Sequence, residues 1–255
     1  MRRDVLASSY RDEKPEVMMP VEAARSTFYD LVHVDSSRDH AVEAQALLRI
    51  VRARHPESSS VLDVACGAGE HLRHLIPHVA VAEGVAVDAP MAAAARQALP
   101  GTTIHEAELP HLDVGRTFDV VTCLHDALAR FPLSGYRAVL RALARHLAPG
   151  GLMILAPIWM PDQATRRTAR EALTRAEDGR TVAHMARGIP RDGAHRLERH
   201  FLVADGDSVR HVEDTRVLRA FGRREHLSAL AAAGCGGDFL SVGLAGRRLL
   251  IGVRR

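Results

Sequence analysis

The sequence predicts an α/β protein that carries a separate antiparallel insert. Between residues 60 and 157, short apolar segments alternate with longer segments of helical periodicity, as expected for a parallel sheet covered by helices on both faces. After residue 157 the segments alternate in polarity and are joined by tight turns, which is typical of an antiparallel meander. A helical segment at 223–234 and two apolar segments then return the chain to the first sheet.

The elements follow in a regular order. Strands are expected at 60–65, 79–88, 102–108, 118–124 and 152–157. Helices are expected within 21–55 and at 89–101 and 136–151, the last two ending at glycine. The turns "RDGAH" and "DGDS" separate the strands of the meander, and "GDFLSVG" and "RRLLIGV" are the final strands.

This order divides the chain into three parts. Residues 1–40 are expected to form an N-terminal arm. The α/β core comprises 41–157 and 218–255. The antiparallel β insert occupies 158–217.

Composition excludes several classes of function. The 255 residues contain no apolar stretch near the 18 residues of a membrane span, and no apolar run follows the two arginines at the start. We therefore expect no membrane association and a cytoplasmic location. The net charge of +3 is spread over scattered arginines and aromatic residues make up only 4%, which argues against nucleic-acid binding. Three distant cysteines, Cys66, Cys123 and Cys235, indicate neither a disulfide framework nor a zinc knuckle.

A group of histidines raises the question of a metal. His71, His74 and His78 have helical spacing, but Pro77 interrupts that face and no distant acid or cysteine cluster completes a set of ligands. A solvated helix face is expected there, and no metal site is predicted.

The stretch "VLDVACGAG" (61–69) has the features of a ligand-binding loop. It joins a strand to a helix through Gly67 and Gly69, which allow positive φ and a close approach of the backbone to a ligand, with Asp63 at the strand end. Leu72 stands where a dinucleotide fingerprint needs its third glycine, and the Gly-Lys-Ser/Thr of a triphosphate loop is absent. The loop therefore fits neither a dinucleotide site nor a triphosphate site.

These residues resemble a known family. "VLDVACGAGEHLRHL" is similar to motif I of class I S-adenosylmethionine-dependent methyltransferases. The segments "FYDLVH", "ARQALP", "HLAPGG", "GRTVAH", "HFLVAD", "VRHVED" and "LLIGV" narrow the resemblance to the dTDP-amino-sugar N-methyltransferases of macrolide pathways. The similarity extends from about residue 25 to residue 254.

The resemblance implies a fold, a cofactor and a reaction. The fold is a Rossmann-like seven-stranded sheet with the last strand antiparallel and a small β insert over the active site. The cofactor is S-adenosyl-L-methionine, the substrate is a small molecule such as a nucleotide-linked amino sugar, and the protein is a homodimer. An amine that has lost its proton attacks the sulfonium methyl group in line, so positioning contributes roughly 7–11 kcal/mol.

The resemblance also assigns cofactor contacts, with some departures. It places them at Tyr29, Asp63, Ala65, Cys66, Gly67, Gly69, Leu109 and Leu124. The family's ribose-binding acid falls on Ala86, so this acid is either lost or moved to Asp88, which would share the same strand face. The family's Gly-Asp pair that contacts the adenine falls on Ala107 and Glu108. The family's arginine in the arm after "YDL" falls on Ser36, and Arg38 close by is the substitute candidate.

The residues expected near the substrate also differ from the family pattern. The family's aromatic or histidine residue near the amine falls on Arg130, which cannot act as a base because its guanidinium stays protonated. His125, just past the fourth strand, is the substitute candidate for the catalytic base. Trp159 matches an aromatic residue of the pocket, and Arg247 matches an arginine that pairs with the substrate diphosphate.

Two functions fit this pattern. One is a methyltransferase of secondary metabolism that acts on an amine or hydroxyl of a nucleotide-linked amino sugar or another small natural product. The other is an enzyme with the methyltransferase fold that has lost methyl transfer and catalyses another step, such as a cyclisation or elimination. The intact motif I, Glu108 and Arg247 support the first function, which is the one we predict, whereas the changes at Ser36, Ala86, Ala107 and Arg130 support the second.

Overall fold

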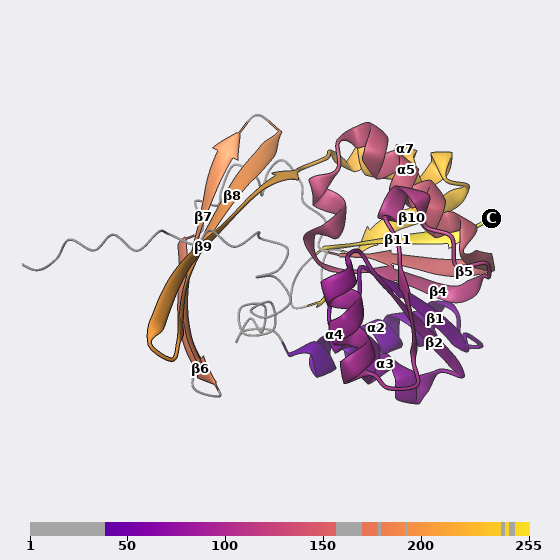
Figure 1. The fold of residues 1–255 in the computed structure, drawn as a ribbon. Coiled ribbons are helices and arrows are strands. Elements are labelled where there is room, and N and C mark those ends of the chain that lie inside the picture. The colour runs from indigo at the N-terminus through magenta and orange to yellow at the C-terminus, as the bar shows by residue number, and fades with distance from the viewer. Residues whose placement is uncertain (1–38, 157–169, 178–179, 192, 241–242, 245–247) are drawn as a thin grey trace, which may run out of the picture.

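The structure is a computed structural model that describes residues 39–156, 170–177, 180–191, 193–240, 243–244 and 248–255. Its strands form two sheets, one of seven strands and one of four. The seven-stranded sheet lies within a body of helices, and the four-stranded sheet stands beside it (Figure 1). No helix of the described part is long and apolar enough to cross a membrane.

The large sheet has the order β10-β11-β5-β4-β1-β2-β3. Its strands are β1 (Ser60–Val64), β2 (Val81–Ala86), β3 (Thr103–Glu106), β4 (Phe118–Cys123), β5 (Leu147–Leu155), β10 (Cys235–Leu240) and β11 (Leu249–Arg254). The first five strands are parallel, and β11 runs antiparallel to both β5 and β10. The seven-stranded sheet with an antiparallel last strand is therefore confirmed.

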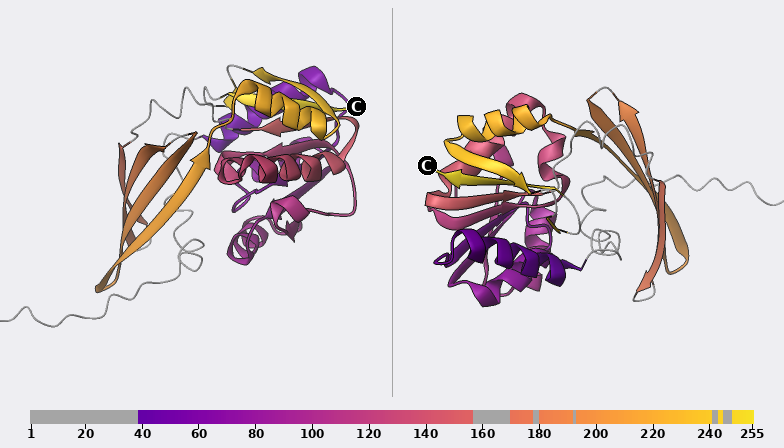
Figure 2. Two further views of the ribbon diagram at one scale, coloured as in Figure 1. Left: turned by 90° about the horizontal axis from the view of Figure 1, so that it is seen from above. Right: turned by 180° about the vertical axis from the view of Figure 1, so that it is seen from behind.

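Helices cover both faces of this sheet (Figure 2). On one face lie α2 (His40–Arg54), α3 (Glu70–Leu75) and α4 (Ala89–Ala98), and on the other α5 (Leu133–Arg145) and α7 (Arg223–Ala232). Three short 3₁₀ helices complete the body: η1 (Ile76–His78), η2 (Leu109–His111) and η3 (His125–Arg130). Each face buries its own cluster of apolar side chains, because strands that are covered twice must be apolar on both sides.

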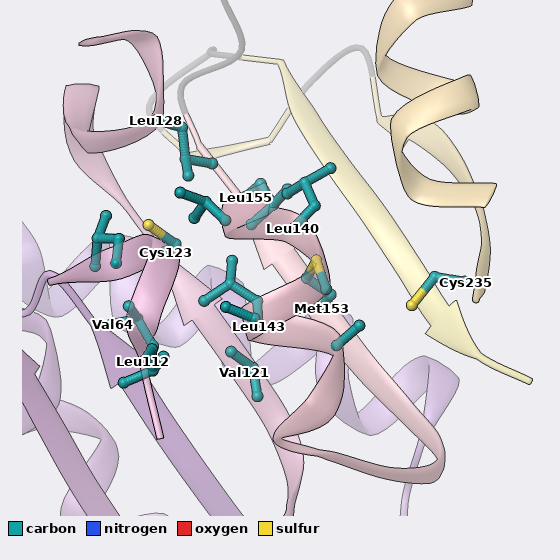
Figure 3. Close-up of a cluster of buried hydrophobic side chains, with 14 of the residues drawn as sticks. Val64, Leu112, Val121, Cys123, Leu128, Leu140, Leu143, Met153, Leu155 and Cys235 are labelled. Carbon is teal, nitrogen blue, oxygen red and sulfur yellow. The ribbon is translucent and has the colours of Figure 1, made fainter. Parts of the chain in front are cut away.

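The core on the α5 side is dense (Figure 3). Leu140 and Leu143 of α5 lie over Val121, Met153 and the neighbouring strand residues, and none of these side chains is exposed. The phenol of Tyr136 and Nδ1 of His226 form a hydrogen bond of 2.8 Å that ties α5 to α7 inside the same cluster. This packing fixes the strands whose carboxyl ends carry the site.

The small sheet contains the three expected strands of the antiparallel meander and a fourth, β6, that was not expected. It comprises β6 (Arg170–Glu177), β7 (Arg180–Arg191), β8 (Ala194–Asp205) and β9 (Ser208–Arg219), each paired with the next. Gly193 and Gly206 turn the chain with positive φ between its last three strands. β9 contacts η3, which follows β4, so the insert lies at the carboxyl edge of the parallel strands (Figure 1).

The element bounds differ from expectation at β5. The helix expected over 136–151 ends at Arg145, and the strand begins at Leu147 rather than at 152. Leu147 pairs with Phe118, and the register then shifts before Val120 pairs with Leu152. At Gly151 a Cβ would lie 2.9 Å from the carbonyl oxygen of Ala148, so this glycine belongs to an irregularity inside the strand and does not end the helix.

Candidate active site

The candidate site begins where the strand order reverses. β1 lies between β2 and β4, and the chain leaves β1 toward β2 and later returns on the other side to β4. Such a switch point opens a crevice outside the carboxyl ends of the strands, because the two connections turn to opposite faces. The loop 65–69 follows β1 there, and Leu124 follows β4.

The loop has an unusual backbone. Ala65, Gly67 and Gly69 have φ of 58°, 60° and 89°, while the residues between them do not have positive φ. Alternation of this kind makes backbone nests that bind anionic groups such as a carboxylate. Among the described residues, Ala65 is the sole non-glycine with positive φ, a conformation that costs roughly 1–2 kcal/mol.

Two glycines let the loop pack closely. A Cβ on Gly69 would lie 2.4 Å from Cδ1 of Leu99, and one on Gly84 would lie 3.0 Å from Sγ of Cys66. The N–H of Cys66 donates to the carbonyl of Val85 at 3.0 Å, which ties the loop to β2. The loop is thus held against β2 and α4 in a way that larger residues would prevent.

Asp63 lies beneath the loop in a buried polar group. Its side chain is fully enclosed and accepts a hydrogen bond of 2.6 Å from the hydroxyl of Thr122 on β4. Burial raises the pKa of this carboxyl, whereas the nearby His71 and the bond from Thr122 act in the opposite direction. Nε2 of His71 lies 2.7 Å from Oε2 of Glu43, so α2 and α3 meet behind the loop through a buried pair.

The position of the ribose-binding acid differs from expectation. β2 ends at Ala86 rather than at residue 88, and the side chain of Ala86 is fully buried among apolar residues. Asp88 is the N-cap of α4, where its Oδ1 accepts a hydrogen bond of 2.9 Å from the N–H of Met91. The expectation that both residues share one strand face is therefore wrong, because the strand has ended before Asp88.

The adenine-side residues lie after β3. Glu108 is exposed and lies 3.4 Å from the ring of His111, whereas Leu109 next to it is buried. The N–H of Ala107 donates to the carbonyl of Ala86 at 3.1 Å, so the two positions where the family pattern departs are neighbours. Of the two residues expected to contact the adenine, Ala107 and Glu108, only Glu108 has a carboxylate.

Comparison with known proteins places this geometry in a family. A sequence model described as a methyltransferase domain matches residues 61–151. A dTDP-3-amino-3,4,6-trideoxy-α-D-glucopyranose N,N-dimethyltransferase of Streptomyces venezuelae is 34% identical over 234 residues, which cover 91% of this chain and 98% of that protein. The chain belongs to the class I S-adenosylmethionine-dependent methyltransferases.

Solved structures agree with this assignment. The sugar N-methyltransferase KedS8 from a Streptoalloteichus species has a TM-score of 0.82 and 37% identity, covering 100% of this chain and 99% of that one. CalS10 of Micromonospora echinaspora, an amino pentose methyltransferase solved with S-adenosylmethionine bound, has a TM-score of 0.79 and 33% identity, covering 89% and 96%. S-adenosylmethionine is thus the cofactor of the family to which this methyltransferase belongs.

The loop of this methyltransferase fits such a cofactor. The alternating backbone at 65–69 suits the carboxylate of its methionine part, and the absence of a Cβ at Gly69 keeps that backbone in place. Asp63, Cys66, Leu109 and Leu124 surround the same end of the sheet and are all buried. These four residues therefore lie near the carboxyl ends of β1, β3 and β4, where the crevice is expected.

Several expected residues have no described side chain. Tyr29, Ser36, Arg38, Trp159 and Arg247 lie outside the described residues. His125 begins η3 directly after Leu124, but only its backbone is described. Arg130 ends η3 and is partly buried; burial raises the pKa of the Cys123 thiol, and Arg130 is close enough to oppose that rise.

The sequence reasoning missed the polar group under the loop. His71 is 3% exposed and paired with Glu43, so the expectation of a solvated face is wrong for this histidine, although His78 is exposed. Thr122 was also missed. The sequence signal for the partner of His71 was Glu43. This acid lies in the helix before β1, four positions before the apolar Leu47.

Asp63 gives the methyltransferase a predictable pH response. Between the ordinary pKa of 3.8 and its raised value in the folded state, the folded protein binds more protons, so the free energy of unfolding falls as pH rises through this window. Asp63→Asn should remove that fall and be more stable than the wild type at neutral pH. Denaturant unfolding from about pH 4 to pH 8 measures it.

Asp119 supplies the control of opposite sign. Although burial opposes them, hydrogen bonds from the N–H groups of Ser59 and Ser60 and from the Ser60 hydroxyl lower the pKa of its carboxyl. Stability from Asp119 is therefore lost as pH falls through the lowered pKa, and Asp119→Asn should lose this acid-side dependence instead. The same pH profile for both variants would contradict the roles given to the two carboxyls.

Proposed function

We propose that this methyltransferase methylates the amino group of a dTDP-linked amino sugar. The observation that carries the proposal is the extent of the similarity: relatives named as dTDP-amino-sugar N,N-dimethyltransferases match over the insert as well as over the cofactor loop. A second one, from Streptomyces fradiae, is 34% identical and covers 88% of this chain and 89% of that protein. All three act on nitrogen, which favours an amine over a hydroxyl as acceptor.

Each part of the fold has a proposed role in binding the cofactor or the substrate. S-adenosylmethionine, when bound, supplies an electrophilic methyl group. The loop 65–69 would hold the methionine part of the cofactor, and Glu108 would bind its adenine amine. The remaining task of the chain is to orient the substrate amine and to exclude water. The insert 158–217 would cover the substrate, with residues 1–40 as the lid and 41–157 with 218–255 as the core.

The amine needs a proton acceptor, and we assign this role to His125. It directly follows Leu124 at the carboxyl end of β4, near the mouth of the crevice. Arg130 at the end of η3 stays protonated and would contact the acidic part of the substrate instead, together with Trp159 and Arg247. His125→Gln should lower kcat by about 10²-fold without changing the affinity for S-adenosylmethionine; an unchanged kcat would refute the role.

The ribose contact is tested at Asp88. We propose that the carboxylate oxygen of Asp88 that does not cap α4 accepts from the ribose hydroxyls. Asp88→Ala removes both the cap and the carboxylate, whereas Asp88→Ser retains a capping oxygen. Calorimetric titration should show S-adenosylmethionine binding weakened by about ten-fold or more in both variants, while only Asp88→Ala loses about 1 kcal/mol of stability. Wild-type affinity in the serine variant would leave Asp88 as a cap alone.

The function itself is tested with defined acceptors. The protein, S-adenosylmethionine and dTDP-3-amino-3,6-dideoxy-glucose or its 3,4,6-trideoxy analogue are incubated, and the product is examined by mass spectrometry. Addition of one and then two methyl groups is the expected result. If neither acceptor gains a methyl group, the result favours the alternative of an enzyme that has lost methyl transfer, with or without bound cofactor, and the buried alanine at position 86 would be one physical basis for it.

A homodimer is proposed as well. Of the six large apolar residues that are exposed in the described part, four lie on one face of the insert: Met185, Leu202, Val209 and Val217, exposed by 43% to 70%. A second copy of the chain would cover this face. Light scattering should give twice the chain mass, and Leu202→Glu should give monomers; a monomeric wild type would refute the proposal.

A further inference from the structure

The outer face of the insert also carries a cluster of metal-ligand side chains. Strand pairing sets His200 of β8 directly opposite Glu213 of β9, and Leu202 opposite His211. Residues that pair across an antiparallel ladder project on the same face, and so do residues two apart along a strand. His200, His211 and Glu213 therefore share one face and meet between neighbouring strands.

The ligand atoms of the three side chains converge. Nδ1 of His200 lies 3.1 Å from Nε2 of His211, Oε1 of Glu213 lies 3.4 Å from the same Nδ1, and it lies 3.8 Å from the same Nε2. Each residue thus turns a single donor atom toward a common point. The two imidazole rings are nearly parallel, with a tilt of 6° and a centroid distance of 5.3 Å.

These separations match a tetrahedral ion. Zinc binds histidine nitrogen and carboxylate oxygen at about 2.0–2.2 Å, and two ligands on such a tetrahedron lie about 3.3–3.6 Å apart. The three distances in the protein bracket this value. Two imidazoles and one carboxylate are also a donor set that zinc and the neighbouring late divalent metals prefer, and they leave a fourth position for water.

The arginines on this face do not bind the Glu213 carboxylate in the described part. The arginines nearest on the same face, Arg187 and Arg196, both bind Glu198, two residues before His200. Glu213 has ion-pair contacts with the two histidines in the described part. In the single chain the side chains of His200, His211 and Glu213 are 43%, 34% and 63% exposed, so an ion can reach them from solvent, and it would lie within the contact if a second copy covers this face.

We propose that His200, His211 and Glu213 form a binding site for one zinc ion, or a related late divalent transition metal, on the outer face of the insert. The ion would join β8 to β9 and brace the meander independently of the cofactor loop. The sequence alone does not display this site, because its ligands come from two strands and meet only through their register.

The test uses the full chain without a histidine tag and freed of metal. Zinc is titrated against a chromogenic chelator, and cobalt is titrated while its visible absorption is followed. We expect one ion per chain with a Kd near or below about 10 μM, and intense visible bands from tetrahedral cobalt. His200→Ala and His211→Ala should each weaken binding at least about ten-fold, while S-adenosylmethionine binding and the circular dichroism spectrum stay unchanged.

A matched control uses another histidine. His78 is exposed but belongs to no group of three such ligands in the described part, so His78→Ala should bind zinc as the wild type does. Glu213→Gln, which retains the shape of the side chain, should also weaken binding. No binding at about 100 μM zinc, or equal affinity in the wild type and both histidine variants, would overturn the proposal.

Discussion

Gly69→Ala should nearly abolish cofactor binding and strongly destabilise the protein. The residue has a φ of 89°, which costs alanine roughly 1–2 kcal/mol, and the added Cβ would lie 2.4 Å from Cδ1 of Leu99. Because Leu99 is buried, its displacement should cost a further 1–3 kcal/mol, roughly the effect of overpacking. Calorimetry should show affinity for S-adenosylmethionine reduced by more than about ten-fold, and denaturant unfolding a loss of about 2–5 kcal/mol.

Gly101→Ala separates the two causes of this loss. Gly101 has nearly the same φ, 85°, but a Cβ there would meet no atom within 4 Å. It should lose only about 1 kcal/mol and leave cofactor binding intact. An equal loss of stability in both variants would show that the contact with Leu99 is unimportant, and wild-type affinity in Gly69→Ala would show that the loop does not hold the cofactor.

Asp214→Ala should cause the largest loss of stability within the insert. Asp214 is 7% exposed on the inner face and contacts the guanidinium groups of Arg199 and Arg216, with Nε of Arg216 at 2.8 Å. Removing one partner of a buried ion pair leaves charge that burial has stripped of water, at a cost of about 3–5 kcal/mol. Urea unfolding monitored by circular dichroism measures the change, and Asp214→Asn distinguishes lost charge from lost volume.

An exposed pair of the same residue types provides the comparison. Arg223 and Asp238 lie 2.6 Å apart, but their side chains are 56% and 72% exposed. Water and salt screen such a pair, so Asp238→Ala should leave the unfolding midpoint within error of the wild type. If the two alanine variants lose similar stability, burial is not what makes the Asp214 cluster important.

The sheet and its loop were predictable from the sequence because their signals are local. The first strand was expected at 60–65 and spans 60–64, since a buried parallel strand is a short, mainly apolar run, which Asp63 alone interrupts after Ser60. The glycine loop after this strand could be predicted equally well, from Gly67 and Gly69. Three strands of the meander were visible through alternating polarity and the two glycine turns between them, whereas β6 was not predicted.

The errors arose where two local signals compete. Asp88 was read by strand alternation, but Asp88 followed by Pro90 is also a helix-start signal, and the structure follows the second reading. Gly151 was read as a helix stop, although it serves an irregularity in β5 that depends on the neighbouring β4. His71 with Glu43, and His200 with His211, depend on tertiary packing or strand register, which a single sequence does not encode locally.

The placement of the insert has a consequence for the order of folding. β5 and β11 are neighbours in the large sheet, yet the whole meander and α7 lie between them along the chain. Each strand of the meander pairs with the next one, so its contacts are short in sequence and can form quickly. Once formed, it replaces a long flexible loop with a compact spacer, which lowers the entropy lost when β11 closes onto β5. The insert, which we propose covers the substrate, would therefore also form early and help the core to close.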